Sequence, residues 1–95
     1  MRLTVSSGGI LQARGITLPE NKIFIIGRVR GVDLGLFNKK VSRRHATIEL
    51  KDGKYVLVDS DSLNGTFVND LKVTECVLKV GDTITICDFK ITIEE

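Results

Sequence analysis

The sequence of 95 residues lacks tryptophan and contains one proline, one tyrosine, one histidine and two cysteines. One histidine and two cysteines are too few ligands for a structural zinc site, and Cys76 and Cys87 also lack the CxxC spacing of such sites. We therefore expect no metal and no cofactor. Both cysteines lie in apolar, strand-like runs, so we predict that they are reduced core residues of an intracellular protein.

Long apolar runs are also absent. The N-terminal segment MRLTVSSGGI has no stretch long enough for a signal peptide or for a membrane-spanning helix. We therefore expect a protein of the nucleus, or alternatively of the cytoplasm, without a membrane partner.

A strong charge of one sign is missing as well. Lysine and arginine number 14 against 12 acidic residues, a net charge of +2, so any site for an acidic partner must be a local cluster. Apolar residues make up 42% and charged residues 27%, as in ordinary globular domains. No linker or repeat interrupts the chain, so we expect residues 1–95 to form a single domain. Because the ends of the sequence coincide with the expected edges of one domain, we also expect it to be a fragment of a larger protein.

Helical periodicity is missing, and short β-branched runs separated by turn residues take its place. Asp52-Gly53 is a dipeptide of tight hairpin turns, and apolar residues alternate on both sides of it. A second hairpin is expected to turn at Asp88. Such hairpins predict an all-β fold, an antiparallel β-sandwich of two packed sheets. The runs expected to form strands are 2–5, 15–18, 22–27, 32–36, 45–59, 65–69, 71–78, 82–87 and 89–95.

Three polar or glycine-rich segments interrupt the strand pattern, at residues 27–31, 37–44 and 60–65. Loops gather at the ends of a sandwich and often carry its function. These segments are therefore the candidates for chemistry, with ordinary turns as the alternative.

Catalysis by Ser42 is the first alternative, because His45 follows it by three residues. A nucleophilic serine also needs a carboxylate, which Asp59 or Asp61 can supply, and an oxyanion hole. No G-x-S-x-G nucleophile elbow is present, and His45 begins a strand-like alternation in which packing would fix its side chain. We therefore predict that the chain is not an enzyme.

Nucleic acid is the second alternative. A basic surface that contacts successive phosphates of a nucleic-acid backbone could be built from Arg28, Arg30, Lys39, Lys40, Arg43 and Arg44. Proteins that bind single strands also use aromatic stacking platforms, and only Phe37 lies beside the basic loop. Nucleic acid is therefore the less favoured ligand.

A phosphorylated residue of a partner protein is the third alternative. Its phosphate needs a guanidinium group together with hydroxyl and backbone N–H donors. Arg28, Ser42 and Arg43 provide such groups, provided that segments 27–31 and 37–44 meet at one end of the sandwich. Spacing alone does not show whether they meet.

Three fragments in order along the chain together resemble the forkhead-associated (FHA) domain: GR at 27–28, VSRRHATI at 41–48 and DSDSLNGTFVN at 59–69. The resemblance covers about residues 22–93. It implies a β-sandwich of about eleven short strands that binds phosphothreonine peptides through loops at one end, and that performs no catalysis.

The resemblance also implies roles for single residues. Arg28 would be the main phosphate ligand, and Ser42 and Arg43 would be further phosphate contacts. Asn64 would hold the backbone of the peptide near the phosphothreonine.

Three further residues would support this site. Gly27 and Gly65 would shape turns, and His45 would brace the loops without reacting. Many members of the family have threonine before the Asn-Gly pair, where this chain has Leu63, so one donor to the phosphate is lost.

The basic loop is most similar to the FHA domains of polynucleotide kinase-like and aprataxin-like DNA-repair factors. The SLNGT motif at 62–66 resembles that of DNA-damage checkpoint mediators. These likenesses imply contacts of Lys39, Lys40 and Arg44 with an acidic ligand, and a role in DNA-damage signalling. Homodimerisation is the alternative function, either through a phosphorylated threonine or through an edge strand such as 89–95.

Overall fold

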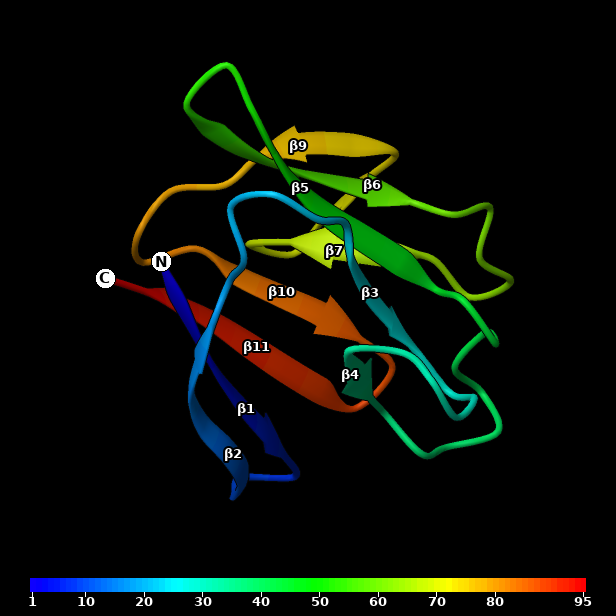
Figure 1. The fold of residues 1–95 in the computed structure, drawn as a ribbon. Coiled ribbons are helices and arrows are strands. Elements are labelled where there is room, and N and C mark those ends of the chain that lie inside the picture. The colour runs from blue at the N-terminus through cyan, green and yellow to red at the C-terminus, as the bar shows by residue number, and fades with distance from the viewer.

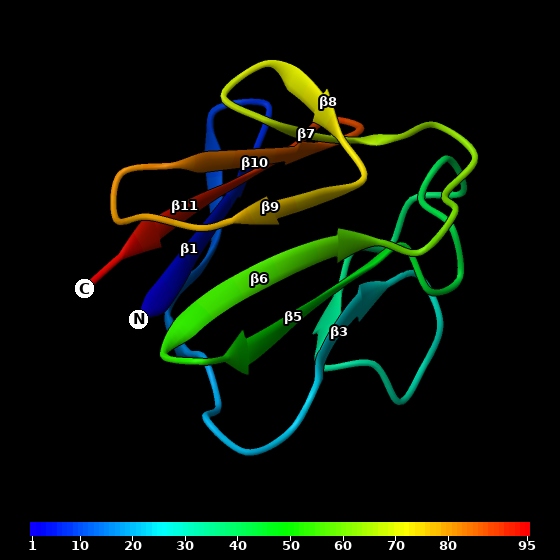
Figure 2. The same cartoon turned by 90° about the horizontal axis from the view of Figure 1, so that it is seen from above.

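The computed structural model describes residues 1–95, which form eleven strands in two packed sheets (Figures 1 and 2). The first sheet has the order β2 (Ile10–Thr17), β1 (Arg2–Ser7), β11 (Phe89–Glu94), β10 (Thr83–Ile86), β7 (Thr66–Val68), β8 (Leu71–Val73). The second has the order β4 (Leu34–Gly35), β3 (Phe24–Gly27), β5 (Ala46–Lys51), β6 (Lys54–Asp59), β9 (Glu75–Val77). The predicted sandwich is confirmed, and every strand pair is antiparallel except β3 with β4. The structure contains no helix of the length and apolar character that a membrane span requires.

Alternating apolar side chains from both sheets build the core. Residues of this cluster that are at most 1% exposed include Leu3, Val5, Ile26, Ile48, Leu57, Ile84, Ile91 and Ile93. Burial of one such side chain contributes about 1.5–3 kcal/mol. The core therefore holds the two sheets as a firm base for the loops.

The hairpin at Asp52-Gly53 forms as predicted, because both residues have the positive φ that the turn requires, 51° and 76°. The second hairpin turns through Cys87 and Asp88 rather than through Asp88 alone, because β10 ends at Ile86. The cysteines are less buried than predicted. Cys76 and Cys87 are free thiols at the edge of the core, and burial raises the pKa of both.

Three strand predictions are wrong. Residues 89–95 do not form an edge strand, because β11 lies between β1 and β10. The run 71–78 is divided into β8 and β9, because the chain crosses from one sheet to the other at Thr74. The run 15–18 is only the end of β2, which starts at Ile10.

The register of the second sheet brings three chain segments to one end of the sandwich. Ala46 pairs with Ile26 on one side and with Asp59 on the other. The chain therefore leaves β3, enters β5 and leaves β6 at the same end, which lies on the right in Figures 1 and 2. Both termini lie at the opposite end, where Arg2 pairs with Glu94.

Candidate functional site

His45 joins the two loops that flank β5 and β6. Its side chain is fully buried, its Nδ1 accepts the backbone N–H of Ser42 at 3.1 Å, and its Nε2 lies 2.8 Å from the carbonyl oxygen of Gly65. Since a carbonyl can only accept, Nε2 carries the proton and donates it. Both ring nitrogens are thereby occupied by backbone groups, so His45 has none left to serve as a base for the Ser42 hydroxyl.

The Ser42 hydroxyl is oriented by the opposite loop. Its Oγ accepts the backbone N–H of Leu63 at 3.0 Å. The hydroxyl donates no hydrogen bond within the protein, so its hydrogen is available to a ligand. The residue that departs from the common pattern, Leu63, thus contributes through its backbone, while its side chain is 89% exposed.

Asp59 stabilises the loop 60–65 rather than the histidine. Its carboxylate accepts the hydroxyls of Ser62 and Thr66 at 2.5 and 2.6 Å, and also the backbone N–H of Ser62. Burial raises the pKa of Asp59, but these hydrogen bonds outweigh that effect and hold the pKa below its ordinary value. Asp61 is exposed with a φ of 56° and makes no hydrogen bond to His45. No catalytic triad is assembled.

Gly27 allows the first and second loops to meet. A β-carbon at this position would lie 2.0 Å from the carbonyl oxygen of Arg43, so no larger residue fits without backbone movement. The N–H of Arg28 donates to the carbonyls of Ser42 and Arg43 at 3.2 and 3.0 Å. Segments 27–31 and 37–44 therefore do meet, as the phosphate hypothesis requires.

The Arg28 side chain is held at its inner nitrogen only. Its Nε donates to the carbonyl oxygen of Val41 at 2.8 Å. Its two terminal nitrogens make no hydrogen bond or ion pair within the protein. A guanidinium fixed in this way can offer two parallel donors to an anion.

Asn64 links the two loops through its side chain. Its Nδ2 donates to the carbonyl oxygen of Lys40 at 2.7 Å, and Cys87 donates to the same oxygen at 3.3 Å. Gly65, which follows, is buried and has a φ of 90°, a conformation that favours glycine. Sequence reasoning missed Cys87, because no local signal connects the β10–β11 turn to a loop 47 residues away.

Asn38 is a second residue that sequence reasoning missed. Its Oδ1 accepts the backbone N–H of Lys40, and its carbonyl accepts that of Val41. This is the local hydrogen bonding by which asparagine shapes turns, and an Asn directly before two lysines could have suggested it.

The basic residues of this end have no acidic partners. Lys39, Lys40, Arg43 and Arg44 are exposed, while the ion pairs of the chain are Lys22–Asp33 and Lys51–Glu49. These basic side chains therefore remain outside the ion pairs of the chain, in the segment 37–44 that also carries Ser42. Phe37 adds a ring that is 75% exposed.

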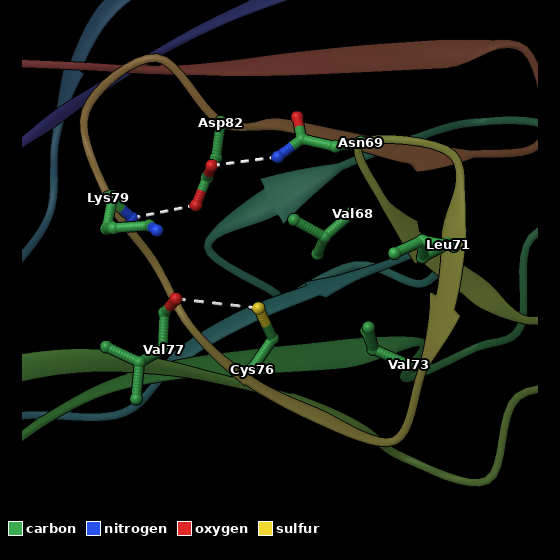
Figure 3. A pocket seen from close by; sticks show the side chains of 8 residues that line it. All are labelled: Val68, Asn69, Leu71, Val73, Cys76, Val77, Lys79 and Asp82. Atoms are coloured by element: carbon green, nitrogen blue, oxygen red, sulfur yellow. Dashed lines mark hydrogen bonds between the residues drawn. The ribbon is translucent and has the colours of Figure 1, made fainter.

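A separate crevice of about 230 Å³ lies among β7, β8 and β9 (Figure 3). Five of its eight lining residues are hydrophobic, and the polar ones bond to each other: Asp82 accepts from the Asn69 amide and from the Lys79 backbone. It includes none of the residues that the sequence predicted for the site. No group of three or more metal-ligating side chains is present in the structure.

Two curated bacterial proteins are similar to this chain in sequence. Over 65 residues, 68% of this chain, it is 43% identical to the glycogen accumulation regulator GarA of Mycolicibacterium smegmatis and 42% identical to an oxoglutarate dehydrogenase inhibitor of Corynebacterium efficiens. The matches cover 41% and 46% of those proteins, so the chain spans less than half of their length.

These relatives correct the predicted localisation. The nuclear prediction is wrong, because the relatives come from bacteria, which have no nucleus. The implied DNA-repair subgroup is not supported either, since both relatives are named for effects on metabolism.

Solved structures agree with the fold. One, from a study of phosphothreonine-dependent FHA domain interactions, covers 100% of this chain and 97% of its own with a TM-score of 0.85 and 32% identity. The FhaA FHA domain complexed with the intracellular domain of Rv3910 covers 95% of this chain and 97% of its own, with a TM-score of 0.81 and 33% identity. The FHA domain family model matches residues 24–87. The chain belongs to the FHA domain family.

Proposed function

We propose that residues 1–95 form a single phosphothreonine-binding domain that captures a phosphorylated segment of a partner protein. One observation carries the proposal: the Arg28 guanidinium has two free terminal nitrogens, and Ser42, whose carbonyl accepts the Arg28 N–H, has a hydroxyl that donates no hydrogen bond within the protein. Arg28 provides two parallel donors to the phosphate, and Ser42 and Arg43 provide the others. Solved relatives support the ligand class, since one was studied for phosphothreonine-dependent interactions.

Asn64 is proposed to hold the backbone of the peptide. One of its amide hydrogens is used by the Lys40 carbonyl, which leaves Oδ1 and the other N–H for a ligand. Gly27, His45 and Gly65 support the site without touching the peptide.

Lys39, Lys40 and Arg44 are proposed to attract acidic residues around the phosphothreonine. They are exposed and unpaired, so they strengthen encounter with a negative segment more than final affinity. Loss of one of these charges should lower affinity only modestly and in a salt-dependent way.

The partner is proposed to be a phosphorylated protein of the bacterial cytoplasm that takes part in metabolic regulation. The names of the relatives, a regulator of glycogen accumulation and inhibitors of oxoglutarate dehydrogenase, support this class. A binding role of this kind needs no catalysis, and no catalytic step is proposed. DNA-damage signalling is left out, because neither name points to it.

Homodimerisation is the second candidate. The observation in its favour is the exposed edge strand β2, where Ile10 is 68% and Leu11 49% exposed. Two register shifts in the β1–β2 pairing interrupt that edge, which is a common protection against strand addition. Light scattering before and after phosphatase treatment would distinguish sheet-mediated pairing from pairing through a phosphothreonine.

A titration tests the main proposal. An oriented phosphothreonine library first supplies the best-binding peptide, which is then compared with its unphosphorylated form and with a single-stranded oligonucleotide at two salt concentrations. We expect binding that requires the phosphate. Equal binding of all three polymers, with a steep fall at high salt, would indicate nucleic acid instead.

A further inference from the structure

Lys72 lies in the edge strand β8, outside the segments 27–31, 37–44 and 60–65. Its positive charge lies near the candidate site that these segments form. In the β7–β8 pair it lies opposite Phe67. Its Cε lies 3.1 Å from the position that a β-carbon of Gly65 would occupy, and the Phe67 ring lies 3.3 Å from the same point. The lysine stem therefore crosses Gly65 next to the aromatic ring.

This packing brings the ammonium group close to the Gly65 turn. A lysine stem commonly covers apolar surface while its charged end stays in water. A β-carbon at Gly65 would crowd the lysine stem, so glycine leaves room for it, and Asn64 directly precedes Gly65. The charge of Lys72 thus lies beside the turn that is proposed to hold the peptide backbone.

Lys72 has no acidic partner within the protein. Neither ion pair of the chain includes it, and its ammonium makes no hydrogen bond. The ammonium group is therefore available to a ligand.

From this geometry we infer that Lys72 is a specificity-determining residue. It selects phosphothreonine peptides that carry an acidic side chain at the peptide position lying next to the Asn64-Gly65 turn. The inference rests on the proposed function. It adds a preference for an acidic residue in the peptide. It also adds a binding residue in β8, outside the loop segments.

The test uses alanine-rich phosphothreonine peptides with one glutamate or one glutamine at each flanking position in turn. For the unaltered protein we expect one position at which glutamate improves affinity by about two- to fivefold over glutamine. Lys72→Gln keeps most of the stem but loses the charge, so this preference should disappear while binding to the glutamine peptides stays unchanged. Lys72→Arg should restore it.

Lys54→Gln is the matched control. Lys54 is an exposed lysine at the start of β6, by the hairpin at the other end of that strand from the site, so its loss changes the net charge equally. It should leave the glutamate preference intact. A preference that survives in Lys72→Gln, or that falls equally in both variants, would overturn the inference alone. If the unaltered protein bound no phosphothreonine peptide at all, the proposed function would fail together with it.

Discussion

At the scale of single residues, the histidine best shows how the structure decides between readings of the sequence. A serine with a nearby histidine in a basic segment is compatible with catalysis, with anion binding and with simple packing. The contacts of His45 with the Ser42 N–H and the Gly65 carbonyl leave only the last role for its ring. Sequence alone could name this residue but not its partners, because Gly65 lies 20 positions away.

His45→Ala should destabilise the protein strongly. The substitution leaves the Ser42 N–H and the Gly65 carbonyl without partners in a buried place, at about 1–3 kcal/mol each, and adds a cavity. We expect the free energy of unfolding in urea to fall by about 3 kcal/mol or more. A decrease below about 1 kcal/mol would show that the ring is not a brace.

At the scale of elements, the strands were easier to predict than the contacts between loops. The β5–β6 hairpin was predictable because Asp52-Gly53 and the alternation beside it are local signals. The central place of β11 was not, because nothing within residues 89–95 shows that β1, from the other end of the chain, pairs with it. Likewise, the meeting of Gly27 with Arg43 is visible only in three dimensions.

Gly27→Ala tests that meeting, with Gly35→Ala as the comparison. Both positions would place a β-carbon in a clash, at 2.0 Å from the backbone oxygen of Arg43 and at 2.4 Å from the ring of Phe37. The Phe37 ring is exposed and can swing away, whereas the Arg43 backbone is part of the site. Gly27→Ala should therefore lower both the melting temperature and phosphopeptide affinity more than Gly35→Ala does. Similar losses in the two variants would contradict the close-packed junction.

The loop 60–65 should weaken in acid through Asp59. Because the folded-state pKa of Asp59 is lowered, its contribution is complete above the unfolded value of about 3.9 and is lost as the pH falls through the folded pKa. Asp59→Asn should reduce stability at neutral pH and flatten the decline below about pH 4. Urea unfolding across this range measures it, with the exposed Asp61→Asn as control. An unchanged acid slope in Asp59→Asn would show that other carboxylates cause the decline.

At the scale of the whole molecule, the sandwich places the two termini and the loops of the proposed site at opposite ends. The termini lie together at one end and the basic loops at the other (Figures 1 and 2). The fold class could be predicted from residue patterns alone. The cellular setting could not, because the charge of a loop carries no information about the organism, and the nuclear prediction failed for that reason.

A folded tag at either terminus should therefore leave phosphopeptide binding unchanged. We expect the dissociation constant of a fluorescent-protein fusion at the N-terminus or at the C-terminus to stay within about twofold of the untagged value, a difference of less than about 0.5 kcal/mol. Fluorescence anisotropy with a labelled phosphopeptide measures this. A larger loss from either fusion would place recognition surface near the termini.

The central claim is that Arg28 binds the phosphate, and isothermal titration of three proteins with one phosphothreonine peptide tests it most directly. Arg28→Ala removes two free charge-assisted donors, at about 1.5–3 kcal/mol each, whereas Arg30→Ala removes an exposed arginine three positions after Gly27. We predict a loss of affinity of at least about 100-fold for Arg28→Ala, with the fold retained, and little change for Arg30→Ala. Affinity that is equal in the unaltered protein and in a folded Arg28→Ala variant would contradict the account.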